Sequence, residues 1–190
     1  TWNMLANIAR VKPEDWVLVM AGGSGIGVAA TQIAKLHGAR VIAAVGSEWK
    51  ASKAIGLGAD VVVNYSAGLI GDQVREATGG YGADVVVHGE LTQENWDDIK
   101  GAVANLGRVV LCGALGAGNL QMDMRHFYRH HFQLMGALAA PLSAFHDVCD
   151  LFEARRLRPV IHEELPLARI REAHQILNDR ANFGKVVLRV

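Results

Sequence analysis

A glycine-rich turn between a predicted strand and a predicted helix is the feature that most constrains the fold of this chain. Residues 17–21 are apolar, residues 22–27 contain four glycines, and residues 28–36 are apolar at helical spacing. Backbone N–H groups at such a turn, with no Cβ in the way and a helix dipole behind them, bind the pyrophosphate of a dinucleotide. The sequence therefore predicts a dinucleotide site formed by Gly22, Gly23, Ser24, Gly25, Ile26 and Gly27.

This turn departs at one position from the spacing G-x-G-x-x-G of dinucleotide-binding proteins. Gly22 and Gly27 occupy the first and last positions, and Ser24 replaces the middle glycine. Serine is small and its hydroxyl can donate to a phosphate, so we retain the prediction. The alternative is a tight strand-to-helix turn that binds no nucleotide.

Composition limits the classes of protein to which the chain can belong. Its 190 residues are 51% hydrophobic with a formal net charge of zero, which is enough for one well-buried core. Balanced charge gives no electrostatic support for binding nucleic acid or an anionic membrane. Cys112 and Cys149 lack the spacing of a zinc finger or a redox pair, and no apolar run is as long as a membrane helix. We therefore expect a cytoplasmic chain that binds no metal itself.

Strand-like runs alternate with helical segments along most of the chain. After the first strand, strands are predicted at residues 40–45, 60–64, 83–88, 108–112 and 132–137, with helices at 48–57, 71–78 and 93–105. Such alternation predicts an α/β fold of the Rossmann type, with a doubly wound, six-stranded parallel sheet in the order 3-2-1-4-5-6. Ligands of such sheets bind beyond the carboxyl ends of the first and fourth strands.

The last part of the chain has a different pattern. Helices are predicted at residues 141–155 and 168–177, and a strand at 184–190. Because the Rossmann sheet is complete at six strands, this last strand needs another sheet. We therefore assign residues 1–160 to an NAD(P)-binding Rossmann domain and residues 161–190 to a C-terminal extension of helix and strand.

Several motifs in order resemble the medium-chain dehydrogenase/reductase superfamily, in its branch of zinc-type alcohol dehydrogenases and quinone oxidoreductases. They are Val-Lys-Pro at 11–13, the glycine-rich turn, Leu-Gly-Ala-Asp at 57–60, Gly-Arg-Val-Val at 107–110, and Phe-Gly-Lys-Val-Val-Leu at 183–188. The resemblance implies that this chain is the cofactor-binding part of a longer enzyme. Members of the superfamily also carry a GroES-like catalytic domain, which supplies any zinc ligands and against which residues 161–190 are expected to pack.

The same resemblance implies a function. It implies that the parent enzyme is an oxidoreductase, which transfers hydride between a nicotinamide cofactor and a small-molecule substrate. The substrate is expected to be a carbonyl or alcohol, or an activated alkene such as a quinone or enoyl group. It also implies a homodimer that pairs through the sixth strand. No catalytic residue is identified, and the isolated chain is expected to catalyse little. Two alternatives remain, a non-catalytic nucleotide-binding module and the enoyl-reductase domain of a multidomain synthase.

The end of the second predicted strand favours NADP(H) over NAD(H). An NAD-specific Rossmann fold usually places an acidic residue there to bind the ribose hydroxyls, whereas this chain has Gly46 and Ser47. Residues 47–50 resemble the 2′-phosphate binders of this superfamily, and the resemblance implies that Gly46 leaves room for the phosphate, Ser47 donates a hydrogen bond and Lys50 supplies a positive charge. Glu48 is the competing residue, because it could accept from an unphosphorylated ribose.

Three further residues are predicted to contact the cofactor. His88 ends the fourth strand and Gly113 follows the fifth, in the segment 112–116, so both face the crevice. Lys185 lies in the last motif of the resemblance. His126 and His130 have the i,i+4 spacing of metal ligands on a helix, but no third ligand is in register, so we interpret them as a solvated or subunit-facing patch.

Overall fold

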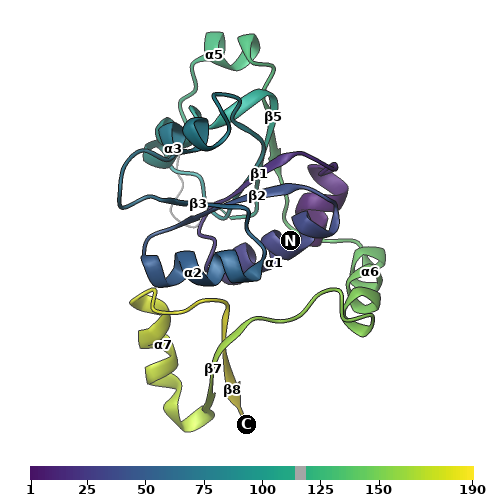
Figure 1. Cartoon of the computed structure of the whole chain (residues 1–190). Coiled ribbons are helices and arrows are strands. Elements are labelled where there is room, and N and C mark those ends of the chain that lie inside the picture. The colour runs from purple at the N-terminus through teal and green to yellow at the C-terminus, as the bar shows by residue number, and fades with distance from the viewer. Residues whose placement is uncertain (114–118) are drawn as a thin grey trace.

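The computed structural model describes residues 1–113 and 119–190, and its main element is a parallel sheet of six strands (Figure 1). The strand order is β3-β2-β1-β4-β5-β6, which confirms the predicted Rossmann topology. The order reverses between β1 and β4, where such sheets bind their ligands. The strands are β1 (Trp16–Val19), β2 (Arg40–Val45), β3 (Val61–Asn64), β4 (Ala83–His88), β5 (Val103–Leu111) and β6 (Gln133–Gly136).

Helices cover both faces of this sheet (Figure 1). Successive side chains of a strand point to opposite faces, so Val17 and Val19 of β1 join one apolar layer and Leu18 joins the other. The first layer includes the N-terminal helix and α1, and the second includes Ile70 and Trp96 from α3 and α4. These helices are η1 (Asn3–Ile8), α1 (Gly25–Leu36), α2 (Glu48–Leu57), α3 (Ile70–Ala77), α4 (Gln93–Ile99) and α5 (Met124–Arg129).

The region around β5 differs from the prediction. The helix expected to reach residue 105 ends at Ile99, and β5 begins at Val103 rather than at 108. Val103 is fully buried in β5, paired with Ala83, and Ala102 is fully buried in the turn just before it. Their apolar side chains also fit helical spacing, which is why the predicted helix extended through them. A short helix, α5, was also not predicted, and Asp123 caps it.

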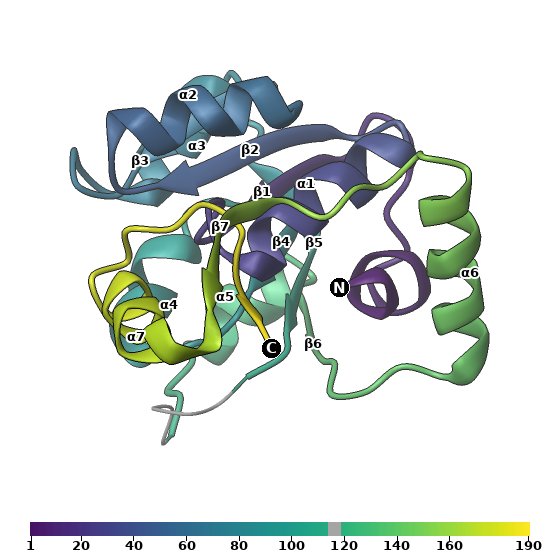
Figure 2. The same ribbon diagram turned by 90° about the horizontal axis from the view of Figure 1, so that it is seen from below.

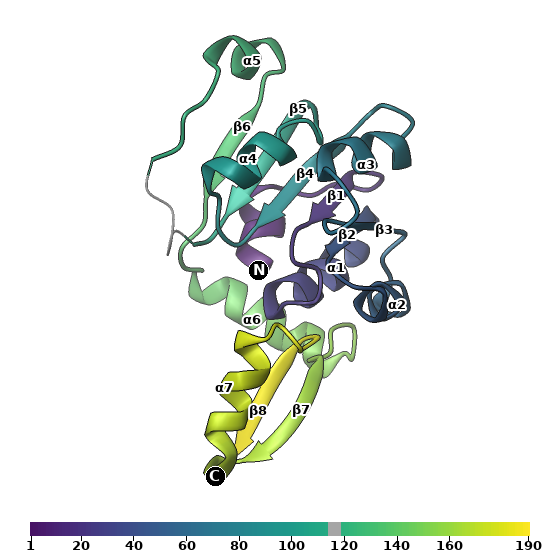
Figure 3. The same ribbon diagram turned by 90° about the vertical axis from the view of Figure 1, so that its left-hand side faces the viewer.

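The C-terminal part forms a second, two-stranded sheet (Figure 3). The predicted last strand pairs in parallel with residues 161–166, which lie just before the second helix predicted for this part. The extension is shorter than the roughly 40 residues below which a unit rarely folds alone, so contacts with the main domain must support it. The elements are α6 (Leu142–Glu153), β7 (Ile161–Pro166), the 3₁₀ turn η2 (Leu167–Arg169), α7 (Ile170–Asn178) and β8 (Lys185–Arg189).

Helix α6 lies beside the N-terminal helix η1 (Figure 2). An apolar cavity of about 620 Å³ lies between α6, the first residues of the chain and α1, lined among others by Trp2, Ile33 and Phe145. Phe145 and Leu142 are more than half exposed, so α6 covers the main domain only loosely.

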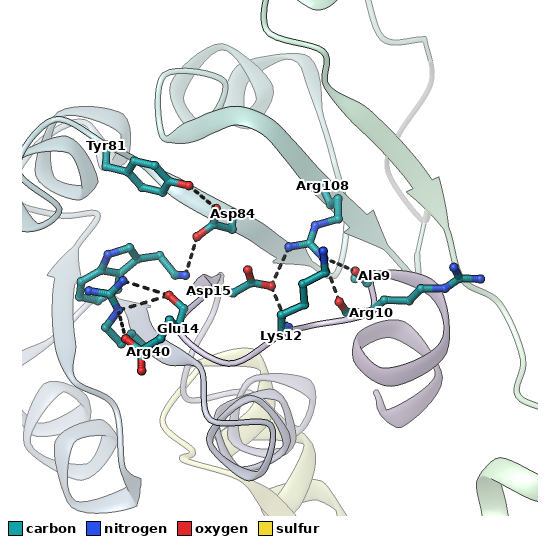
Figure 4. Close-up of polar contacts among 10 residues, drawn as sticks. Ala9, Arg10, Lys12, Glu14, Asp15, Arg40, Tyr81, Asp84 and Arg108 are labelled. Carbon is teal, nitrogen blue, oxygen red and sulfur yellow. Dashed lines mark hydrogen bonds and ion pairs between the residues drawn. The ribbon is translucent and has the colours of Figure 1, made fainter.

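Arg108 of β5 ties the N-terminal segment to the sheet (Figure 4). Its guanidinium donates to the carbonyls of Ala9 at 2.6 Å and Arg10 at 2.9 Å, and to Asp15 Oδ2 at 2.6 Å. Asp15 also accepts from the backbone N–H of Lys12. The Arg108 and Asp15 side chains are only 14% and 12% exposed, so this charge pair is well shielded from water.

Replacing Arg108 tests this anchor. We expect Arg108→Met to lower the free energy of unfolding by about 3 kcal/mol, because it leaves the Asp15 carboxylate unpaired in a shielded site. Urea denaturation measures the change. Lys100→Met is the control, since the ion pair between Lys100 and Asp97 is 42% and 52% exposed and its loss should cost less than about 1 kcal/mol. Equal losses in the two variants would contradict the proposed role of Arg108.

Candidate cofactor site

The glycine-rich turn joins the end of β1 to the start of α1, as its sequence predicts. Ser24 caps α1, and its Oγ accepts from the backbone N–H of Gly27 at 3.0 Å. The hydroxyl hydrogen of Ser24 remains a donor. The serine that departs from the glycine pattern therefore holds the helix end and keeps a donor at the turn.

The glycines of this turn serve two purposes. A Cβ at Gly27 would collide with the Ala21 carbonyl and the Gly22 backbone, and one at Gly22 would lie 3.1 Å from Ala43 Cβ. These two glycines let α1 approach β1 and β2 closely. At Gly23 and Gly25 the atoms nearest to an added Cβ are side-chain atoms, from Phe183 and Lys50 at Gly23 and from Lys185 at Gly25. Gly23 is buried under these side chains, whereas Gly25 is partly exposed.

The Lys185 side chain lies against Gly25 at the amino end of α1. A Cβ on Gly25 would touch Lys185 Cε and Nζ. The positive end of a helix dipole and an ammonium group repel each other, and an anion between them would stabilise both. The turn therefore has the shape and the potential that a pyrophosphate requires.

The loop between α7 and β8 covers the other side of the turn. The backbone N–H of Gly184 donates to the Gly23 carbonyl at 2.8 Å, and Phe183, which is 4% exposed, lies against Gly23. Gly184 has φ +90°, and a Cβ there would collide with the Val160 carbonyl. The structure thus brings Lys185 to the predicted turn from the opposite end of the chain.

Gly46, Ser47 and Lys50 lie together where β2 meets α2. A Cβ at Gly46 would lie 2.5 Å from the Tyr65 ring, and the Ser47 side chain makes no capping bond to α2. Glu48 is exposed. The Lys50 ammonium donates to the Arg180 carbonyl, and burial, followed by the charge of Arg180, lowers the pKa of Lys50.

His88 and Gly113 lie at the ends of β4 and β5. His88 is 8% exposed, and its Nδ1 accepts from the Glu90 N–H at 3.1 Å, so a neutral ring carries its proton on Nε2. Burial lowers the pKa of His88, and the charge of Glu90 opposes this effect. Gly113 lets the segment after β5 approach the segment after β4 closely, because a Cβ there would lie 2.5 Å from the Gly89 carbonyl. Residues 114–116 of the predicted segment lie outside the described residues.

The histidines of α5 form a packed pair. The rings of His126 and His130 lie 4.2 Å apart, and the His126 ring also contacts Phe132 at 5.2 Å. His126 is partly exposed, and its Nε2 is buried with no hydrogen-bond partner among the described residues. The interpretation of this pair as a solvated or subunit-facing patch stays a prediction. Within residues 1–113 and 119–190, no group of three His, Cys, Asp or Glu side chains is placed to hold a metal ion. No helix in these ranges is long and apolar enough to cross a membrane.

Sequence reasoning missed Tyr65 and Arg180. Both reach the site only through tertiary contacts, Tyr65 with Gly46 and Arg180 with Lys50. Their sequence positions, after β3 and after α7, carry no glycine pattern or charge run that would mark them.

The fold and the glycine-rich turn define a Rossmann domain of the dinucleotide-binding type. A family of zinc-binding dehydrogenases matches residues 25–154, more than half of the chain, and the chain belongs to this family. The resemblance to zinc-type alcohol dehydrogenases and quinone oxidoreductases inferred from the sequence is thereby confirmed.

Individual relatives cover nearly all of this chain. It is 30% identical to the NAD-dependent alcohol dehydrogenase of Sulfolobus acidocaldarius (96% of this chain, 53% of the relative). It is 26% identical to the quinone oxidoreductase of Rattus norvegicus (97% and 57%), and 28% identical to the highly reducing polyketide synthase cm3B of Cordyceps militaris (98% and 8%). A crystal structure of an NAD-dependent alcohol dehydrogenase has a TM-score of 0.89 at 42% identity (100% and 55%). The chain thus spans about half the length of these two alcohol dehydrogenases and of the quinone oxidoreductase.

Proposed function

We propose that this chain is the nicotinamide-dinucleotide-binding part of an oxidoreductase, which transfers hydride to or from a carbonyl or alcohol, or an activated alkene. The observation that carries the proposal is that the amino end of α1, Ser24 and Lys185 lie together at the glycine-rich turn, where they would bind an anion. Membership of the dehydrogenase family supports it. The cofactor supplies the hydride chemistry, and the protein binds and orients it.

Residues of the turn would hold the pyrophosphate. The N–H groups of Gly25 and Ile26 belong to the first turn of α1 and have no partner within the helix. Four donors therefore lie at one place, namely these two N–H groups, the Ser24 hydroxyl and the Lys185 ammonium. Beyond the turn, the neutral His88 and the main chain at Gly113 would line the site beside the nicotinamide half of the cofactor.

The ribose end supports a preference for NADP(H). Lys50 and Arg180 place two positive charges close together, the Ser47 hydroxyl makes no capping bond, and Glu48 is exposed. A 2′-phosphate would pair with both cations, whereas an unphosphorylated ribose would not. The Sulfolobus relative is named NAD-dependent, so the preference needs a direct test.

The remaining assignments concern the whole protein. Substrate and proton donor would belong to a GroES-like catalytic part, with residues 161–190 packing against it, and we propose that the protein acts in the cytoplasm. The match to a polyketide synthase favours one second candidate, an enoyl-reductase region of a multidomain synthase. The parent reading frame would distinguish the two, because a synthase also encodes carrier and ketosynthase regions.

Calorimetric titration with NADPH and with NADH tests the proposed function. We expect NADPH to bind at least about tenfold more tightly, a difference of about 1.4 kcal/mol. Lys50→Met should weaken NADPH binding by about tenfold and leave NADH binding within about twofold, because only NADPH carries the phosphate. Lys53→Met is the matched control on the same helix. Tighter NADH binding would assign the ribose contact to Glu48, and no binding of either cofactor would reject the proposed function.

We also propose that the protein is a homodimer joined through β6. Among the strands of residues 1–113 and 119–190, this one lies at the edge of the sheet and pairs with β5 alone. Its Leu134 is 38% exposed, and Leu138 just beyond it is 98% exposed. An apolar free edge promotes aggregation, and pairing of two such edges across a two-fold axis removes it.

Light scattering on a sizing column tests the dimer. The chain should elute with twice the mass of one protomer, and Leu134→Lys should convert it to monomer because a charge would be buried in the interface. Leu177→Lys, at a 48% exposed position of α7, should remain dimeric. A monomeric wild-type chain would contradict the proposal.

A further inference from the structure

The loop between α7 and β8 connects the C-terminal extension to both ends of the candidate cofactor site. At the pyrophosphate end, the Gly184 N–H donates to the Gly23 carbonyl at 2.8 Å. At the ribose end, the Arg180 carbonyl accepts from the Lys50 ammonium. Two contacts from one short loop therefore join the extension to α2 and to the glycine-rich turn.

Lys50 and Arg180 are neighbours of like charge. The Lys50 ammonium bonds to the main-chain carbonyl of Arg180, so it lies against the residue that carries the guanidinium. In keeping with this geometry, the charge of Arg180 adds to burial in lowering the pKa of Lys50. Within residues 1–113 and 119–190, neither side chain forms an ion pair with a carboxylate. An ammonium has three donors, and one is used on the Arg180 carbonyl. Two donors of Lys50 and the Arg180 guanidinium thus remain for an anion.

The extension that carries Arg180 has a small apolar core. Its buried apolar side chains among the described residues are Leu165, Ala173 and Phe183. Elements with few buried contacts have a low free energy of local unfolding. One additional charge-assisted contact therefore raises this free energy by a measurable fraction.

We infer that the 2′-phosphate of NADPH, held between Lys50 and Arg180, fastens the extension (residues 161–190) to the dinucleotide-binding domain, and that NADH does not. The inference rests on the proposed function and adds to it a coupling between the type of cofactor and the rigidity of the extension. The phosphate would neutralise the repulsion of the two cations and join α2 to the loop after α7. The rigidity of the extension would then depend on which cofactor is bound. Any part of the protein that packs against the extension would be affected by this difference.

Hydrogen exchange measured by mass spectrometry on this chain tests the inference. Saturating NADPH should slow amide exchange in residues 176–185 by about fivefold or more relative to saturating NADH, the lower end of ordinary coupling between sites. Adenosine 2′,5′-bisphosphate should slow exchange in the same residues relative to AMP, because it carries the phosphate without the nicotinamide half.

Three variants make the test specific. Lys50→Met should abolish the difference between NADPH and NADH. Arg180→Gln should lose most of it, although its main-chain carbonyl still holds Lys50. Lys53→Met should keep the full difference, because Lys53 shares with Lys50 the contact with the Trp49 ring, at 5.3 and 5.2 Å, while Lys50 alone of the two bonds to Arg180.

The outcomes separate this inference from the proposed function. Equal exchange with both dinucleotides at saturation overturns the inference and leaves the proposed function standing. A difference that persists in Lys50→Met also overturns it. If neither dinucleotide binds in the calorimeter, the proposed function fails and the inference fails with it.

Discussion

The close approach of α1 to the end of β1 is the constraint on which the rest of the structure depends. It requires Gly27, because any side chain there would collide with the backbone of Ala21 and Gly22. The approach directs the free N–H groups of α1 toward the carboxyl edge of the sheet, between β2 and β4. The same contact that closes the core therefore forms the candidate anion site.

The second half of the site comes from the far end of the chain. Lys185, Gly184 and Arg180 follow or lie within the loop after α7, and they reach the glycine-rich turn and Lys50 through contacts that no local pattern encodes. The extension that carries them is too short and buries too few apolar side chains to be stable alone. Its position depends on the main domain, and the candidate site depends on its position.

The sequence predicted the parallel sheet and the glycine-rich turn because both follow from short-range periodicity and from the steric demands of glycine. It misplaced the boundary between α4 and β5, since the buried apolar run at Ala102 and Val103 fits helical and strand spacing equally well. It missed Tyr65 and the contact of Arg180 with Lys50, which arise only when distant segments pack.

The most direct test of the account is the affinity of Gly25→Ala for NADPH, measured beside its stability. A Cβ at Gly25 would meet only the flexible end of Lys185, so the free energy of unfolding should change by less than about 1 kcal/mol. The methyl group would occupy the space expected for the pyrophosphate and displace the Lys185 ammonium. We predict a loss of NADPH affinity of about tenfold or more in a folded protein. Unchanged affinity would contradict the claim that this turn holds the cofactor.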